Sequence, residues 1–140
     1  MKVSITKLNN DAVLPAYSRD GDAGLDITAT GMSIQEKYIE YTTGIAMAIP
    51  EGHVGLIFPR SSISNKELLL SNCVGVIDSN YRGEIKFRFK YNEADPSDYY
   101  SVGDRVGQLI IMPYPKIEFV LTDQLPETNR GSGGFGSSGN

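Results

Sequence analysis

The sequence has one cysteine, one histidine and no long hydrophobic run. Because Cys73 is the only cysteine of the 140 residues, no disulfide can form within the chain. No apolar run approaches the ~20 residues that a membrane-spanning helix needs. The first residues, Met1–Lys7, also lack the apolar stretch of a signal peptide. These absences predict a protein of the cytoplasm, or of a host's cytoplasm if a virus encodes it, with no membrane partner.

The chain also lacks an excess of positive charge. Its formal net charge is −4 and its pI is about 4.9. Recognition of DNA or RNA needs a basic face, so we expect no nucleic-acid partner. A few well-placed arginines can still bind a small anion. A length of 140 residues gives room for one domain with a sizeable core.

The sequence shows no group of His, Cys, Asp and Glu residues with the spacing of a metal-binding cluster. His53 stands in a Pro-Glu-Gly-His turn, where a structural or surface role is expected. Cys73 has no nearby histidine that would activate it as a nucleophile. We therefore predict that Cys73 is a small buried apolar residue.

Short apolar segments separated by Gly, Pro, Asn and Asp predict an all-β protein. Ile85–Tyr91 alternates with the period of a half-buried strand. Turn residues recur roughly every ten positions, so we predict two packed sheets in a jelly-roll sandwich or barrel. One short helix is expected to begin within Ser61–Glu67, where Ser64 and Glu67 have the spacing of a capping box. The other predicted strands are Leu25–Thr28, Tyr38–Tyr41, Ile45–Ile49, Val54–Phe58, Val106–Met112 and Ile117–Leu121.

Residues 130–140 differ from the rest of the chain. They contain five glycines and three serines, which cannot build a core. The same segment carries Arg130, which can clamp two phosphate oxygens, and Phe135, which can stack on a planar base. One interpretation is a flexible arm over residues 127–140 that closes over a ligand on the core of residues 1–126. The other is a disordered tail or an expression linker.

The segment Asn72–Glu84 carries the best candidate for a catalytic acid. Apolar residues lead directly into Asp78, and glycines bracket the segment. The pattern predicts a hairpin that places this carboxylate beside exposed backbone amides. Asp78 would then act as a general base for a water molecule. Alternatively, Asp78 accepts hydrogen bonds from the N–H groups of its own turn.

Three further segments carry polar residues suited to a phosphate or metal site. Asp22 and Asp26 share one face of an extended segment, where they either hold metal-bound waters or cap a turn. Arg60–Ser64 places an arginine and hydroxyls at the start of the expected helical turn, where they either bind phosphate or cap the helix. Gln108 enters an apolar strand and either donates to a phosphate or faces solvent.

In this order, the segments resemble the five motifs of the homotrimeric dUTP pyrophosphatase (dUTPase) family. Ala23–Ile27 is similar to the first motif and Pro59–Ser62 to the second. Gly75–Gly83 is similar to the third, Gly103–Gln108 to the fourth and Arg130–Ser137 to the fifth. Each motif alone is weak or moderate support, whereas five in sequence across nearly the whole chain are strong support.

The resemblance implies a β-clip jelly-roll that forms a homotrimer with active sites shared between subunits. It also implies hydrolysis of dUTP to dUMP and pyrophosphate, by water attack on the α-phosphorus, with Mg²⁺ on the triphosphate. Asp78 matches the acid that activates the water, and Asp26 matches the acid that reaches the metal through water. The matching substrate-binding residues are Arg60, Ser61, Ser62, Asn72, Gly75, Val76, Ile77, Tyr81, Gln108, Arg130, Phe135, Gly136 and Ser137.

The resemblance also distributes roles among these residues. The backbone of Gly75–Ile77 would read uracil, and Tyr81 would pack on the deoxyribose. Arg60–Ser62 and Gln108 would contact phosphates, and the residues from Arg130 onward would form the closing arm. Two alternatives stay open. One is a dCTP deaminase-like enzyme, which shares the fold and an Arg-Ser-Ser motif, and the other is a trimeric regulatory module that binds a protein partner.

Overall fold

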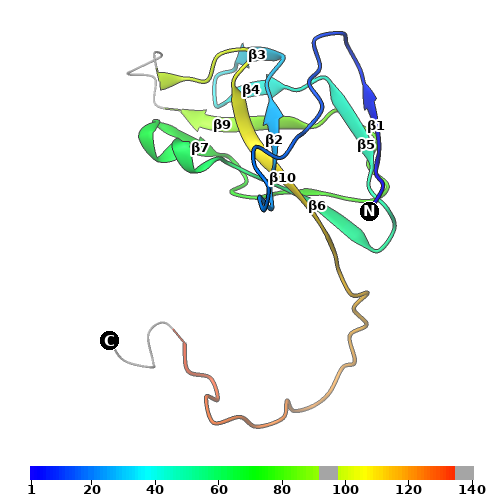
Figure 1. Ribbon diagram of the computed structural model, residues 1–140. Coiled ribbons are helices and arrows are strands. Elements are labelled where there is room, and N and C mark those ends of the chain that lie inside the picture. Colours follow the sequence, from blue (N-terminus) through cyan, green and yellow to red (C-terminus); the bar gives the residue numbers. More distant parts are fainter. Residues whose placement is uncertain (92–97, 135–140) are drawn as a thin grey trace.

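The computed structural model describes residues 1–91 and 98–134 (Figure 1). These residues form β1 (Ser4–Lys7), β2 (Leu25–Thr28), β3 (Gly31–Ile34), β4 (Ile39–Thr42), β5 (Ile45–Ala48), β6 (His53–Phe58), the 3₁₀ helix η1 (Ser61–Asn65), β7 (Leu68–Leu70), β8 (Gly75–Ile77), β9 (Lys86–Tyr91) and β10 (Arg105–Pro113). Within these two ranges, no helix has the length and apolar character needed to cross a membrane. The prediction of an all-β fold is confirmed.

Two four-stranded antiparallel sheets and one two-stranded ribbon make up the body. One sheet has the strand order β2-β10-β6-β8 and the other β3-β4-β9-β7, while β1 pairs with β5. The two larger sheets bury their inner faces against each other, which is the arrangement of a jelly-roll sandwich. Core residues come from both, with Ile57 and Leu109 on one sheet and Phe87 and Phe89 on the other.

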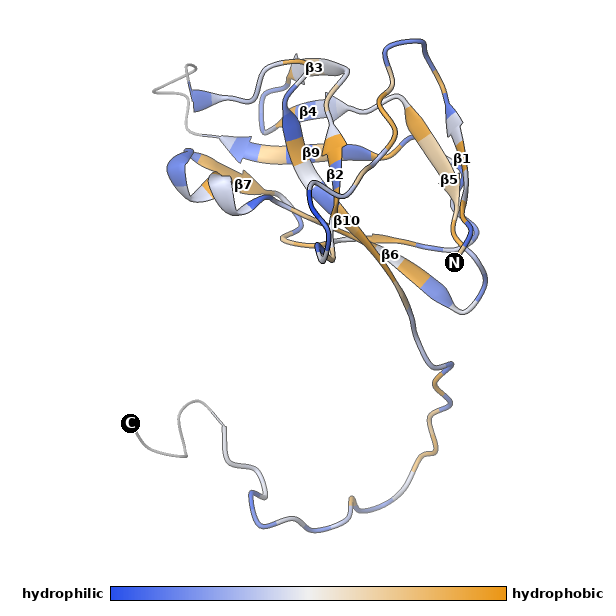
Figure 2. Ribbon diagram, in the orientation of Figure 1, coloured by the Kyte–Doolittle hydropathy of each residue, from blue (hydrophilic) through white to orange (hydrophobic). Residues whose placement is uncertain are grey.

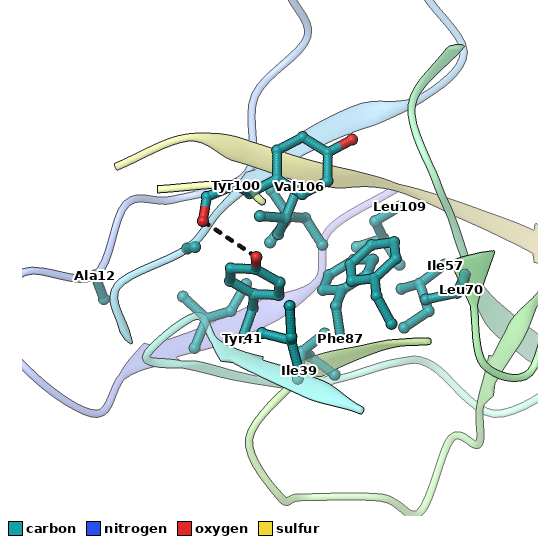
Figure 3. Packing of buried hydrophobic residues seen from close by; sticks show 14 of the residues in the cluster. Ala12, Ile39, Tyr41, Ile57, Leu70, Phe87, Tyr100, Val106 and Leu109 are labelled. Carbon is teal, nitrogen blue, oxygen red and sulfur yellow. Dashed lines mark hydrogen bonds between the residues drawn. The ribbon is translucent and has the colours of Figure 1, made fainter. Parts of the chain in front are cut away.

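Alternation along the strands explains this burial. In β9, Phe87 and Phe89 are fully buried, while Lys86 and Arg88 point to the opposite, exposed face. Phe89 makes an edge contact with Tyr41, at 5.8 Å between ring centroids. The buried Tyr41 hydroxyl donates a hydrogen bond of 3.1 Å to the backbone oxygen of Tyr100, which satisfies its polar end (Figure 3).

Strand β10 organises the sheet that carries most of the candidate residues. It pairs with β2 on one side and β6 on the other, so Gln108 lies between Asp26 and Phe58. A register shift between Arg105 and Gly107 marks a β-bulge in the pairing with β2. The pairing therefore gathers the first, second and fourth motif-like segments at one end of this sheet.

The predicted strand Ile117–Leu121 is wrong. This segment belongs to no strand, and with the rest of residues 114–134 it runs away from the body (Figure 1). Phe119 is 92% and Leu121 100% exposed. Figure 2 shows hydrophobic positions along this segment outside the body. The residues have strand-like composition, but the described part of this single chain offers them no neighbouring strand to pair with.

Two local predictions also need correction, the burial of Cys73 and the capping box of the short helix. Cys73 is exposed rather than buried, and it occupies the left-handed region at a φ of 59° in the turn before β8. The helix within Ser61–Glu67 is a short 3₁₀ turn without a capping box. The Ser64 hydroxyl donates to the Ser61 backbone oxygen instead, at 3.0 Å, and the Glu67 amide donates to the Asp98 carboxylate.

The predicted hairpin in Asn72–Glu84 is wrong as well. Strand β8 pairs with β6, and the chain then crosses to the other sheet, where β9 pairs with β4 and β7. The reversal between β8 and β9 is closed by a 3.1 Å hydrogen bond from the Tyr81 amide to the Asp78 backbone oxygen. The segment is therefore a connection between the sheets, with Asp78 at the point where the chain leaves β8.

Candidate active site

A pocket with a volume of about 510 Å³ lies beside β8. Its lining includes the predicted residues Asn72, Gly75, Val76, Ile77, Asp78 and Tyr81, together with Ile57, Leu70, Ser71, Glu84, Ile85, Lys86 and Arg88. The volume falls in the range of small-molecule sites. Because β8 is the last strand of its sheet, its outer backbone N–H and C=O groups have no partner strand. The pocket thus combines apolar walls with free backbone donors and acceptors.

Asp78 follows directly after β8 and has an exposed side chain. Its carboxylate accepts no hydrogen bond from the described residues, so the interpretation as a turn-capping aspartate is not supported. An ionised carboxylate without partners is a competent proton acceptor. The carboxylate of Asp78 is therefore available to accept a proton from a water molecule, as a general base must be.

Tyr81 is held at the rim of the pocket by local geometry. Its hydroxyl donates a 3.1 Å hydrogen bond to the backbone oxygen of Glu84. The side chain passes so close to Gly83 that a Cβ there would lie 2.3 Å from the Tyr81 hydroxyl oxygen. Glycine at position 83 is thus a condition for this placement of Tyr81. Gly75 is equally constrained, since a Cβ there would lie 2.3 Å from Ile57.

A charged network covers one wall of the pocket. Glu40 accepts hydrogen bonds from Lys86 (3.0 Å) and Arg88 (2.8 Å). The hydrogen bond from Lys86, followed by that from Arg88 and by both positive charges, holds the pKa of Glu40 below its ordinary value, although burial opposes the shift. Glu84 accepts from the backbone amides of Thr43 and Gly44 at 3.2 and 2.8 Å, which ties the pocket rim to the β4–β5 turn.

A second group of polar residues surrounds Asp26 on β2. The Arg105 Nη1 lies 2.8 Å from Asp26 Oδ2, and the Gln108 Nε2 donates to Asp26 Oδ1 at 3.2 Å. The Arg60 Nε lies 3.3 Å from the same Oδ1 as an ion pair. Asp26 is 9% exposed, and its negative charge is paired with two guanidinium groups. The three groups together carry one net positive charge. This group is a natural place for phosphate oxygens.

Arg105 is a residue of this group for which the sequence predicted no role. The signal was present, because Arg105 belongs to the fourth motif-like segment and precedes Gln108 by three residues. Its meeting with Asp26 depends on the pairing of β10 with β2 and on the bulge in that pairing.

The described residues hold no group of three His, Cys, Asp or Glu side chains that would bind a metal directly. Mg²⁺ usually keeps several waters and is bound by substrate phosphates with one or two carboxylates. The two oxygens of Asp26 offer about four acceptor positions. Hydrogen bonds from Arg105 and Gln108 occupy two of them, and the Arg60 Nε lies beside Oδ1 as an ion pair at 3.3 Å. The position left on Oδ2 suits a metal-bound water rather than the metal itself.

The pocket beside β8 and the group around Asp26 lie far apart in one chain. Gly55 of β6 pairs with Ile77, just before Asp78, whereas Arg60 lies five residues further along the same chain direction. At about 3.3 Å per residue, these five residues span about 16 Å. A general base must come within about 3 Å of the proton that it removes. The backbones of Asp78 and Arg60 therefore stand about 16 Å apart in one chain, and the Arg60 guanidinium is directed at Asp26 rather than at Asp78.

The glycine-rich end is only partly described. Arg130 is exposed, and its Nε donates to the backbone oxygen of Gly133 at 2.9 Å. The described segment after β10 runs away from the body that carries both groups (Figure 1). The predicted residues Phe135, Gly136 and Ser137 lie outside the described residues.

Comparison with known proteins agrees with this geometry. The family described as dUTPase matches residues 10–139. The deoxyuridine 5'-triphosphate nucleotidohydrolase of Finegoldia magna is 45% identical and covers 99% of both chains, and that of Leifsonia xyli is 40% identical over 90% of this chain and 85% of the relative. A mutant dUTPase of Staphylococcus bacteriophage 80alpha with dUpNHpp superposes with a TM-score of 0.86, at 25% identity, over 99% of both chains.

Together, the jelly-roll with its nucleotide-sized pocket and these matches define the class: the chain is an enzyme of the dUTPase family. A further solved relative, a mutant dUTPase from phage phi11, is described with a structural Mg(II) ion; it is 25% identical, with a TM-score of 0.74, over 89% of this chain and 98% of the relative.

Proposed function

We propose that this protein hydrolyses dUTP to dUMP and pyrophosphate. The observation that carries the proposal is the carboxylate of Asp78, which has no hydrogen-bond partner among the described residues, at a pocket of about 510 Å³ lined by an edge strand. The relatives at 40–45% identity bear the name of this activity, and the solved phage relative contains a dUTP analogue.

Uracil recognition follows from the edge of β8. An edge strand offers alternating N–H donors and C=O acceptors to a planar base, as it would to another strand. Uracil has one N–H between two carbonyl groups, and cytosine reverses part of this pattern. Cytosine would leave buried groups unpaired, which costs more than a missing contact. Tyr81, fixed over Gly83, closes the space where a ribose 2'-hydroxyl would stand.

The chemical step uses Asp78 as general base. Its carboxylate takes a proton from a water molecule while the water oxygen attacks the α-phosphorus. The bond from the α-phosphorus to the bridging oxygen breaks, and pyrophosphate leaves with that oxygen and the bonding electron pair. Arg60 and Gln108, held by Asp26, donate to the phosphate oxygens, and Ser61 and Ser62 complete the set. Mg²⁺ on the triphosphate would neutralise charge, with Asp26 holding one of its waters.

The active sites are shared between subunits of a homotrimer. The supporting observation is the distance of about 16 Å along β6 that separates Asp78 from the phosphate-binding residues of its own chain. In a closed ring, Asp78 of one subunit faces Arg60 and Gln108 of a neighbour. The apolar side chains of residues 114–125, exposed in the single chain, are then available for contacts between subunits.

The arm of residues 127–140 closes over the bound nucleotide. Arg130 donates to phosphate oxygens, Phe135 stacks on the base, and Gly136 and Ser137 add further donors. We expect a chain that ends at Asn129 to fold with the same thermal stability and to lose most of its turnover, because the arm adds almost no core. Phe135→Ala should lose less activity than the truncation, since it removes stacking only. Full activity of the truncated chain would contradict a closing arm.

A nucleotide panel tests the proposed function. Pyrophosphate release is measured with dUTP, dTTP, UTP and dCTP, and ammonia release is measured with dCTP in parallel. We expect rapid pyrophosphate release from dUTP and steep discrimination against the other three. Ammonia from dCTP would favour a deaminase, and comparable rates with UTP would contradict the role of Tyr81. A trimer that releases neither pyrophosphate nor ammonia from these nucleotides would favour the alternative of a regulatory module that binds a protein partner.

A further inference from the structure

Two buried side-chain polar atoms of the described residues lack a hydrogen-bond partner, and both adjoin η1. They are the Nε of Arg60 and the hydroxyl oxygen of Tyr100. Arg60 directly precedes η1, and the Lys66 Nζ, directly after η1, lies 4.7 Å from the centroid of the Tyr100 ring. Buried polar groups without partners are uncommon in native proteins and often belong to functional sites. The Arg60 Nε still lies 3.3 Å from Asp26 Oδ1 as an ion pair, so the Tyr100 hydroxyl is the atom that has neither kind of partner among the described residues. It adjoins the segment that carries Ser61 and Ser62 through Lys66.

Tyr100 itself is held firmly in the core. It is 4% exposed, and its ring contacts those of Tyr41 and Phe89, with centroids at 6.0 and 5.7 Å. The Tyr41 hydroxyl donates to the backbone oxygen of Tyr100 (Figure 3). The phenol oxygen of Tyr100 itself has no hydrogen-bond partner among the described residues. Lys66 adds a 2.9 Å hydrogen bond to the Asp98 backbone oxygen. These contacts fix the position of the Tyr100 hydroxyl.

The groups around this hydroxyl belong to the phosphate-binding segment. Burial raises the pKa of Tyr100, while the neighbouring Ser62 hydroxyl and the Arg60 charge lower it again. The geometry also relates the two residues, because Ser62 is the second residue of η1 and Lys66, directly after η1, packs on the Tyr100 ring. The Tyr100 hydroxyl has no hydrogen-bond partner among the described residues. Phenylalanine would fill the same space without burying an unpaired hydroxyl. Packing alone therefore does not explain why residue 100 is tyrosine rather than phenylalanine.

We propose that Tyr100 is a positioning residue of the phosphate subsite and that its hydroxyl donates a hydrogen bond to the Ser62 oxygen when triphosphate is bound. A serine hydroxyl has one hydrogen to donate and accepts at its oxygen. Phosphate oxygens only accept, so Ser62 must point its hydrogen at the phosphate. If the Tyr100 hydroxyl donates to the Ser62 oxygen, the Ser62 hydrogen is left to point at the phosphate. This inference rests on the proposed function, because it takes Ser62 as a phosphate contact.

The test compares Tyr100→Phe, Ser62→Ala and the double variant in full-length protein. Binding of dUpNHpp and inhibition by deoxyuridine, which has no phosphate, are measured for each. Tyr100→Phe should weaken dUpNHpp binding about 3- to 10-fold and leave deoxyuridine unchanged. The double variant should bind dUpNHpp no more weakly than Ser62→Ala. Tyr91→Phe is the matched control, because it removes a hydroxyl that bonds to the Gln35 backbone oxygen, and it should leave both ligands unaffected.

Each outcome decides the question. Equal binding of dUpNHpp by wild type and Tyr100→Phe would overturn the inference alone. The same fold-loss in the Ser62→Ala background, an equal loss with deoxyuridine, or a thermal midpoint lowered by several degrees would show a structural role and overturn it too. A wild-type protein that neither hydrolyses dUTP nor binds dUpNHpp would overturn the proposed function together with this inference.

Discussion

The carboxylates of Asp78 and Asp26 have opposite surroundings, one open to solvent and the other enclosed by polar side chains. Asp78 is exposed and accepts no hydrogen bond from the described residues, whereas Asp26 is 9% exposed and is surrounded by two arginines and a glutamine. A carboxylate without hydrogen-bond partners can take up a proton, while one that already accepts from several side chains holds those side chains in position. One residue type thus supports reaction chemistry in the first region and ligand positioning in the second.

Asp78→Asn should have the largest effect. The variant keeps the shape of the side chain and removes the base, so we expect kcat for dUTP to fall on the order of 10²–10⁴-fold with nucleotide binding retained. Steady-state kinetics and titration with dUpNHpp check the two parts separately. Hydrolysis of dUTP at the wild-type rate would show that Asp78 is not the base.

Mixing two inactive variants separates shared sites from sites within one chain. Asp78→Asn chains and Arg60→Ala chains are unfolded, mixed in equal amounts and refolded together. If one subunit supplies Asp78 and another supplies Arg60, about a quarter of the sites recover both residues by random assembly. Activity should therefore rise well above that of either variant refolded alone. Activity that stays at the level of the separate variants, despite hybrid assembly by mass, would place the whole site in one chain.

Asp26→Asn should lower stability as well as activity. It leaves the Arg60 and Arg105 guanidinium groups without their counter-charge, which we expect to reduce the free energy of unfolding by about 1–3 kcal/mol. Asp22→Asn is the control, because exposed Asp22 accepts one hydrogen bond from the Arg19 amide and should change stability by under about 0.5 kcal/mol. Urea unfolding checks both variants. Equal stability of Asp26→Asn and wild type would contradict an organising role for Asp26.

Glu40→Gln should have the smallest effect, confined to the pH dependence of stability. Because hydrogen bonds from Lys86 and Arg88 lower the pKa of Glu40 in the folded state, the stabilisation is present above the unfolded pKa of about 4.5 and is lost as pH falls through the folded value. The stability difference between wild type and Glu40→Gln should therefore shrink below pH 4.5. Thermal unfolding at several pH values tests this, with exposed Glu36→Gln as control. A pH-independent difference would contradict it.

Most of the architecture could be predicted from local pattern. The alternation in Ile85–Tyr91 corresponds closely to β9, and Leu25–Thr28 matches β2 residue for residue. Strands β1, β3 and β7 were missed. Strands β1 and β3 contain few apolar residues and are largely exposed, and β7 is only three residues long. The strand character of β1 and β3 comes from the pairing of β1 with β5 and of β3 with β4, which local sequence does not encode.

The site was predicted unevenly for the same reason. Asp78 and the residues of Gly75–Ile77 are neighbours in sequence, so their common pocket followed from one segment. Arg105 was missed, because its contact with Asp26 joins residues that are 79 positions apart.

By itself, the sequence determined the all-β class, the segments that carry the chemistry and the family to which they belong, because alternation and motif order are properties of the chain alone. Only the tertiary structure decided that Asp26 would be surrounded by Arg60, Arg105 and Gln108 and that Cys73 would be exposed. It also decided that, among the described residues, the Asp78 carboxylate has no hydrogen-bond partner and Ile117–Leu121 has no partner strand. Strand order and register arise from contacts between distant segments, whose free energy no local pattern contains.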